Sequence, residues 1–206
     1  MATTTSAQPG LASGPWRTID LMTAAVIGVA FGIVYWGWSA AYSALSTPLS
    51  NVLGPAVGLL GGPWLIAGVV GGLVVRRPGA ALFAELLAAA VEALVGNEWG
   101  WSTLISGGLQ GLGVEIALAL FAFRRFGWPV AALAGVVAAL LEFGYEWHAY
   151  WQGTTLGFKL GYLGFFALSG AVVAGLGGWL LTRKLAATGA IDALPAGRES
   201  AAEHPA

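Results

Sequence analysis

The sequence predicts an all-α integral membrane protein with six transmembrane helices, both termini in the cytoplasm and a long outer loop after the first helix. Three observations support this fold class: the apolar composition, the lengths of the apolar runs and the placement of the basic residues. Of the 206 residues, 57% are hydrophobic and 9% are charged, whereas soluble domains carry about 25% charged residues. A core of this size cannot absorb so much apolar surface, so we expect lipid to surround the chain.

Six apolar runs have the length of about 20 residues that a helix needs to cross a hydrocarbon core of roughly 30 Å. The second run contains Pro55, Gly61, Gly62 and Pro63, so it is either one span or a half-helix followed by a shorter helix. The runs cover residues 18–40, 54–75, 79–96, 103–123, 128–147 and 160–182.

The basic residues predict the orientation. Lys159 flanks one set of alternate connections, and most of the remaining basic residues lie at the other set, which the positive-inside rule places in the cytoplasm. The membrane domain then covers residues 17–184, between disordered cytoplasmic tails at 1–16 and 185–206. The residues that set this orientation are Arg17, Arg76, Arg77, Arg124, Arg125, Arg183 and Lys184.

The hairpin at residues 79–115 holds polar side chains that a membrane protein has no structural need for. A carboxylate near the bilayer centre costs roughly 2.5–3.5 kcal/mol, so an intramembrane ionisable group marks a functional site by default. Glu92 lies just below the Asn97–Ser102 connection, and we expect Glu92, Asn97 and Gln110 to meet a ligand entering from outside. Glu85 lies deeper. Glu115 is on another face of its helix than Gln110, and we expect it to make an interhelical or partner contact.

The fifth run ends in EFGYEWHAYWQ, where acids alternate with aromatic residues. Glu142 and Glu146 are spaced i,i+4 and share one helix face, with Tyr145 and His148 close by. An aromatic belt at the headgroups explains some of the rings but not the carboxylates. Acids among aromatic faces suit an organic cation that stacks and forms an ion pair. The alternative is that these acids only hold helices together.

Two further patterns carry hypotheses. Trp36, at the end of the first run, and Trp101, in the third connection, are either interface anchors or part of an apolar pocket with a few convergent polar groups. Ala24, Gly28 and Gly32 form a stripe of small residues along the first run, and such stripes let helices approach closely. The stripe serves either internal packing or docking to another membrane subunit.

Several function classes find no support. The chain has no cysteine and two histidines, so we expect no metal site and no catalytic residues, and no motif indicates a cofactor. The net charge of −1 indicates no nucleic-acid surface. No Walker A motif is present, so the chain does not use ATP by that route. A structural or assembly protein of the membrane remains an alternative, followed by an intramembrane enzyme acting on a lipid or prenyl group.

The run RRPGAALFAELLAAAVEALVGNEWGWSTLISGGLQGLGVE resembles the YkoE family, the membrane-embedded substrate-binding (S) components of energy-coupling-factor (ECF) vitamin transporters. The resemblance covers most of residues 17–184. It implies a six-helix S component in the bacterial cytoplasmic membrane that captures thiamine or its hydroxymethylpyrimidine (HMP) precursor. It also implies an EcfT-like coupling subunit and cytoplasmic ATPases as partners. S components of this class typically dock through an Ala-xxx-Ala motif, which Ala24, Gly28 and Gly32 match only in part, and Tyr42–Leu53 would serve as a lid.

Overall fold

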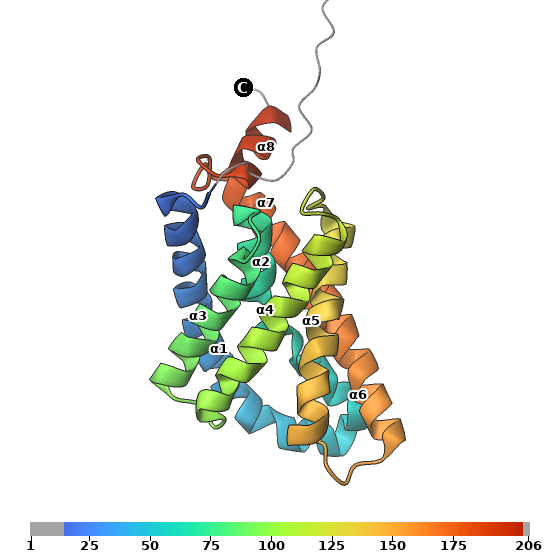
Figure 1. Cartoon of the computed structure of the whole chain (residues 1–206). Helices are drawn as coiled ribbons and strands as arrows, with labels where there is room; N and C mark the ends of the chain where they lie inside the picture. The colour runs from blue at the N-terminus through green and yellow to red at the C-terminus, as the bar shows by residue number, and fades with distance from the viewer. Residues whose placement is uncertain (1–14, 204–206) are drawn as a thin grey trace, which may run out of the picture.

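Helical segments run between two ends of the molecule in the computed structural model, which describes residues 15–203 (Figure 1). Four stretches of this described part are long and apolar enough to cross a membrane, namely Thr18–Val75, Gly100–Leu120, Trp128–Ala149 and Leu156–Ala187. The elements are α1 (Thr18–Leu53), η1 (Gly54–Leu60), η2 (Gly62–Leu65), α2 (Ile66–Val75), α3 (Ala80–Val95), η3 (Gly100–Ser102), α4 (Thr103–Leu120), α5 (Trp128–Ala149), α6 (Leu156–Ser169), the π-helical η4 (Gly170–Leu176), α7 (Gly177–Ala187) and α8 (Pro195–Glu203).

The first helix is longer than its apolar run. Helix α1 continues to Leu53 with Pro48 inside it, so the long outer loop expected at Tyr42–Leu53 is wrong. A proline inside a helix removes one hydrogen bond and kinks the helix without always ending it. In Figure 1 the last part of α1 and η1 cross the lower end of the molecule toward α6.

The C-terminal segment also departs from the sequence prediction. Helix α7 extends to Ala187 and α8 follows at Pro195–Glu203, so the disordered tail expected from residue 185 is wrong for the described residues up to 203. Ile191, Leu194 and Ala196 are buried against α1, α2 and α3. This apolar contact explains why the segment is ordered. The expected tail at 1–16 lies outside the described residues except for its last two.

The second membrane segment is broken where its prolines and glycines predicted a break. Helix α2 therefore begins within the molecule, and its first amides need partners because lipid offers none. The Ala67 amide donates to the Tyr35 hydroxyl at 2.8 Å, and the Gly68 amide donates to Glu85 at 2.5 Å. Glu85 thus holds the start of α2 against α3.

The small-residue stripe of α1 is buried inside the bundle. Ala24, Gly28 and Gly32 all face α3. A Cβ atom on Gly28 would lie 2.8 Å from the Ala84 carbonyl oxygen, closer than real Cβ atoms approach. The stripe therefore packs internally, and the expectation that it docks a partner is wrong in this structure.

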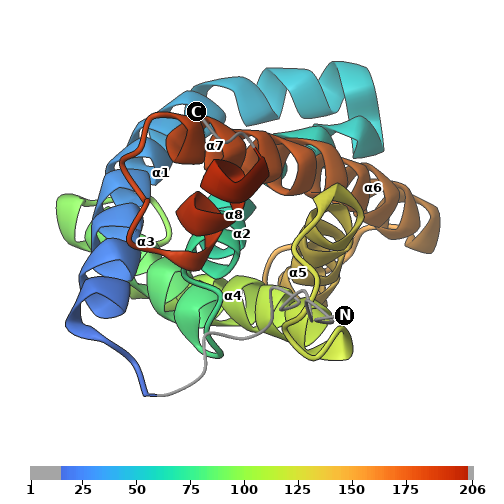
Figure 2. The same ribbon diagram turned by 90° about the horizontal axis from the view of Figure 1, so that it is seen from above.

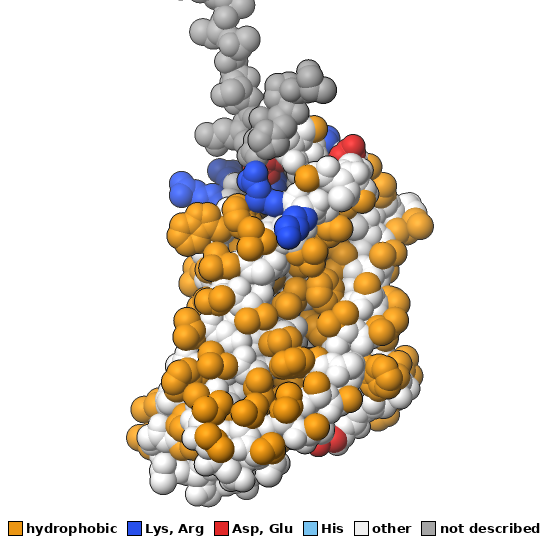
Figure 3. Space-filling view, turned by 180° about the vertical axis from the view of Figure 1, so that it is seen from behind, with side chains coloured by type: hydrophobic (Ala, Val, Ile, Leu, Met, Phe, Trp, Pro, Cys, Tyr) orange, Lys and Arg blue, Asp and Glu red, His pale blue; other side chains and the backbone are white. Residues whose placement is uncertain are grey.

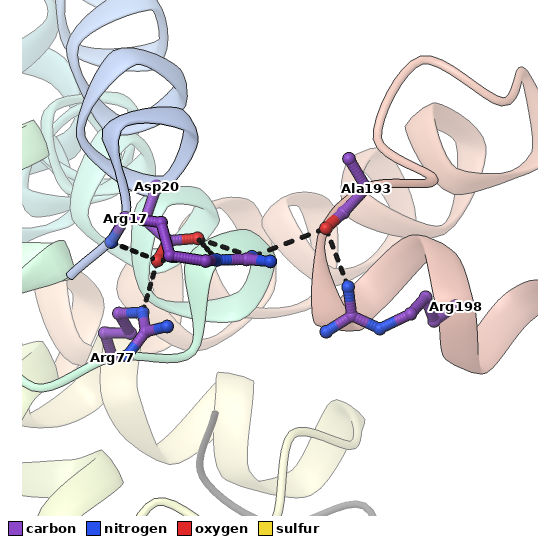
Figure 4. A network of polar contacts seen from close by, with 5 residues as sticks. All are labelled: Arg17, Asp20, Arg77, Ala193 and Arg198. Carbon is purple, nitrogen blue, oxygen red and sulfur yellow. Dashed lines mark hydrogen bonds and ion pairs between the residues drawn. The ribbon is translucent and has the colours of Figure 1, made fainter. Parts of the chain in front are cut away.

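Charged residues stabilise the end of the molecule at which the described part of the chain begins and ends (Figure 4). The fully buried Asp20 accepts the Arg17 amide at 2.9 Å and the Arg17 guanidinium at 2.8 Å, and it also pairs with Arg77. Arg17 and Arg198 both donate to the Ala193 carbonyl. Lysine and arginine side chains gather at this end, above a surface rich in apolar side chains (Figure 3). We call it the basic end.

Candidate ligand-binding site

A cavity of about 300 Å³ opens at the end of the bundle opposite the basic end. Its buried floor includes Tyr35, Glu92 and Phe166, while Glu98 and Tyr150 at its rim are exposed, so the cavity reaches the surface. It is lined by Tyr35, Tyr42, Gly61, Trp64, Ala89, Glu92, Glu98, Trp99, Thr103, Ser106, Gln110, Glu142, Glu146, Tyr150, Trp151, Tyr162 and Phe166.

The first wall of the cavity is built around Glu92 of α3. Its Oε1 atom accepts a hydrogen bond from Ser39 of α1 and another from the Trp64 indole at 3.3 Å. Its Oε2 atom is buried without a hydrogen-bond partner. One oxygen therefore fixes the side chain, and the other has no donor among the residues that the structure describes.

An aromatic cluster extends this wall toward the surface. Trp64 packs edge-on against Trp38, Tyr42 and Trp99, with ring centroids 6.2, 5.1 and 5.6 Å away. Asn97 holds the turn before η3, because its side-chain oxygen accepts the amides of Trp99 and Gly100 at 3.1 and 2.7 Å. Asn97 thus positions the aromatic wall but does not line the cavity.

The second wall is built by α5, α6 and the connection between them. Glu146 accepts hydrogen bonds from the Trp151 indole at 3.3 Å and from the Tyr162 hydroxyl at 3.4 Å. The Trp151 and Tyr162 rings lie 4.6 Å apart between centroids. One helical turn deeper, Glu142 keeps a buried Oε2 atom without a partner.

The cavity is lined by acidic groups and by no basic ones among the described residues. Four carboxyl groups line it, and no lysine, arginine or histidine is among the described residues of its lining. At the rim, partial burial raises the pKa of Tyr150 to about 12, so this phenol stays protonated well above neutral pH. The cavity therefore offers acceptors and aromatic faces to a ligand that brings donors or positive charge.

The structure places four of the sequence-predicted site residues in the cavity and five outside it. Trp36 and Trp101 are exposed by 43% and 64%, and His148 is also exposed. The Tyr145 ring packs edge-on against the Tyr150 ring, with 5.9 Å between the ring centroids. Those in the lining are Glu92, Gln110, Glu142 and Glu146; those outside it are Trp36, Asn97, Trp101, Tyr145 and His148.

Glu115 makes the interhelical contact expected of it. Its Oε1 atom accepts the backbone amides of Ala81 and Leu82 at 2.8 and 3.3 Å. These amides belong to the first turn of α3, where a helix has unpaired donors and a partial positive charge. Glu115 therefore caps α3 near the basic end.

Sequence reasoning did not place several lining residues in the site. Trp64 and Tyr162 lie inside long apolar runs, where a single aromatic residue carries no signal of its own. Glu98 is an exposed loop residue, and Tyr42 belongs to a segment that the sequence predicts as a loop but that forms part of helix α1. Only the helix break at Gly61–Pro63 could have indicated that Trp64 lines the cavity, because broken helices at membrane depth line cavities.

Comparison with known proteins defines the class. A crystal structure of an S component of an ECF transporter matches with a TM-score of 0.83 and 30% sequence identity, covering 93% of this chain and 100% of that one. The family model for the permease component of the ABC-type cobalt transport system matches residues 19–141. The chain is thus a membrane component of a transporter and not an enzyme.

A curated relative narrows the class to a family. A Bacillus subtilis (strain 168) protein, which is named as an HMP/thiamine permease protein, YkoE, is 31% identical over 186 residues. The alignment covers 89% of this chain and 92% of that protein. The chain therefore belongs to the YkoE family of ECF-transporter S components.

Proposed function

We propose that the chain captures thiamine or an HMP-type pyrimidine from outside a bacterial cytoplasmic membrane. It would deliver this ligand as the S component of a complex with an EcfT-like coupling subunit and cytoplasmic ATPases. The observation that carries the proposal is the cavity itself, with its four carboxyl groups and two aromatic walls. The name of the B. subtilis relative supports the same ligand class.

The chemistry of thiamine matches the two walls. Thiamine has a permanently cationic thiazolium ring and an aminopyrimidine ring with hydrogen-bond donors. Two aromatic walls allow both rings to stack, and a cation against a π face gains roughly 0.5–2 kcal/mol. The unpartnered oxygens of Glu92 and Glu142 can accept the donors or face the charge. HMP shares the pyrimidine but lacks the cation, so it would use only part of the site.

The orientation that we propose follows from the charges at the two ends. Arg17, Arg77 and Arg183 belong to the basic end, which the positive-inside rule assigns to the cytoplasm. Lys159 lies at the opposite end, with its ammonium 4.3 Å from the centre of the Trp147 ring. The cavity then faces outward, and both chain ends face inward, toward the ATPases that supply the energy.

Direct titration tests the proposal. The purified full chain in detergent micelles is titrated with thiamine and, separately, with HMP, while isothermal calorimetry measures the heat of binding. We expect saturable binding of thiamine. Glu92→Gln should weaken it about 30-fold or more, because removing one partner of a buried charged contact costs about 2–5 kcal/mol. HMP should respond much less to the same change.

Glu115→Gln is the matched control, because it makes the same chemical change at the capped start of α3, away from the cavity. Its affinity for thiamine should equal that of the parent. A parent chain that binds neither compound would refute the proposed ligand class. Equal affinity of the parent and Glu92→Gln, in folded protein, would leave the acids with a structural role only.

A further inference from the structure

A second cavity, of about 160 Å³, lies at the basic end between the membrane helices and α8. Figure 2, which looks onto this end, shows α8 lying over α2 and α7. The two cavities lie at opposite ends of the bundle and share no lining residue. The second is lined by Leu73, Arg76, Phe126, Gly127, Trp128, Trp179, Thr182, Arg183, Ala186, Ala196, Glu199 and Ser200.

Arg76 provides a buried cation in this cavity. It ends α2, its Nε atom donates to the Leu73 carbonyl at 3.1 Å, and its guanidinium lies 4.5 Å from the centre of the Phe126 ring. Only 6% of the residue is exposed, and a charge so buried requires an anion. The anion is Glu199 of α8, whose own side chain is 37% exposed. A short C-terminal helix thus brings the counter-charge to a cation fixed in the membrane domain.

The outer side of the cavity has the features of a membrane interface. The Arg183 guanidinium lies 5.3 Å from the centre of the Trp179 ring, and Trp128 is 55% exposed. Leu180, one turn from Lys184 along α7, is 51% exposed toward the surrounding medium. Tryptophan marks the headgroup level of a bilayer, and exposed leucine beside it fits acyl chains. The cavity therefore lies at the boundary between a charged surface and an apolar one.

We propose that this cavity binds the phosphate of an anionic phospholipid headgroup, with Arg183 at its entrance and Arg76 at its base. The lining contains two guanidinium groups and one carboxylate, and arginine holds phosphate through paired N–H donors. Basic pockets between membrane helices are a recognised form of headgroup site. Glu199 occupies the place of an anion at Arg76, so lipid phosphate and α8 compete for the same cation.

Native mass spectrometry of the full chain in detergent micelles tests the proposal. The protein is titrated with dioctanoylphosphatidylglycerol, with dioctanoylphosphatidylcholine and with inorganic phosphate alone. We expect one saturable phosphatidylglycerol adduct. Arg183→Gln should weaken it about fivefold, the effect of one cation near an anionic lipid. Glu199→Gln should strengthen it severalfold, since it removes the competing carboxylate. Both side chains are partly exposed, so both variants are expected to fold.

Arg125→Gln is the matched control, because Arg125 is exposed in the α4–α5 connection at the basic end and outside the cavity. It should change the phosphatidylglycerol affinity by less than about twofold, because single lipids in micelles present no charged surface. Equal losses of phosphatidylglycerol affinity in Arg183→Gln and Arg125→Gln would overturn the proposed site. Weaker phosphatidylglycerol binding by Glu199→Gln would overturn it as well. Inorganic phosphate that binds as tightly as phosphatidylglycerol and displaces it would support the phosphate site and assign its source to solution.

Discussion

The two ends of the molecule treat buried charge in opposite ways. At the basic end, the buried Asp20 is paired with Arg17 and Arg77, and the buried Arg76 is paired with Glu199. At the cavity end, Glu92 and Glu142 are as deeply buried, yet each keeps one oxygen without a partner in the described part of the chain.

We interpret this difference as one between charges that stabilise the fold and charges that would meet a ligand. A buried ion pair that satisfies its own hydrogen bonds keeps helices in register. A buried polar atom without a partner costs free energy, and native structures keep few of them. We interpret the unpartnered oxygens in the cavity as the cost of a binding site, which a ligand would offset.

The largest effect is expected at the basic end. Asp20→Asn should lower the free energy of unfolding by about 3–5 kcal/mol, because it removes the negative charge of a buried ion pair with Arg77. Thermal and denaturant unfolding in micelles measures the loss. Asp192→Asn, at an exposed aspartate, is the matched control and should unfold like the parent. Unchanged stability of Asp20→Asn would show that the basic end is not fastened by this pair.

The same substitution at either end should have opposite effects. Glu142→Gln should not lower stability, since its Oε2 atom has no partner to lose, but it should weaken thiamine binding about 30-fold or more. Glu115→Gln should lower stability by about 1 kcal/mol, because a neutral amide interacts less with the start of α3, and leave thiamine affinity unchanged. Melting curves and calorimetric titrations of both variants check the pair. Loss of affinity in both, or in neither, would break the distinction between the ends.

Much of the membrane fold could be predicted from the sequence because lipid imposes strong constraints. Span length is fixed by bilayer thickness, so α3, α4 and α5 begin within one residue of the predicted runs. The continuation of α1 through Pro48 could not be predicted, because it depends on tertiary contacts at the cavity end. The same holds for α8, whose polar sequence is ordered by the burial of Ile191 and Leu194 nearby.

The candidate site was predictable for acids and poorly predictable for aromatic residues. Glu92 and Glu142 stand out because a carboxyl group in an apolar run needs an explanation, and both line the cavity. Their role in ligand binding stays a prediction. Tryptophan and tyrosine face lipid or protein with equal ease, so spacing alone cannot tell which ring points inward. A helix that is apolar on every face gives no sign of its rotation.

Tyr35 and Trp36 show this limit most clearly, and the smallest effect that we expect is that of a substitution at Trp36. They are adjacent on α1 and therefore about 100° apart around the helix. The sequence favoured Trp36 as a site residue, yet Tyr35 is 1% exposed and lines the cavity, whereas Trp36 is 43% exposed.

Tyr35→Phe removes the hydroxyl that accepts the Ala67 amide, which leaves a buried donor unpaired at the start of α2. We expect the free energy of unfolding to fall by about 1–3 kcal/mol. Trp36→Phe keeps an aromatic ring on the exposed face of α1. It should change the free energy of unfolding by less than about 0.5 kcal/mol and leave thiamine affinity unaltered. Thermal melting and calorimetry of the two variants, side by side, measure both quantities. A larger effect from Trp36→Phe than from Tyr35→Phe would mean that α1 is rotated relative to this structure, and the cavity wall that includes Ser39 and Tyr42 would have to be redrawn.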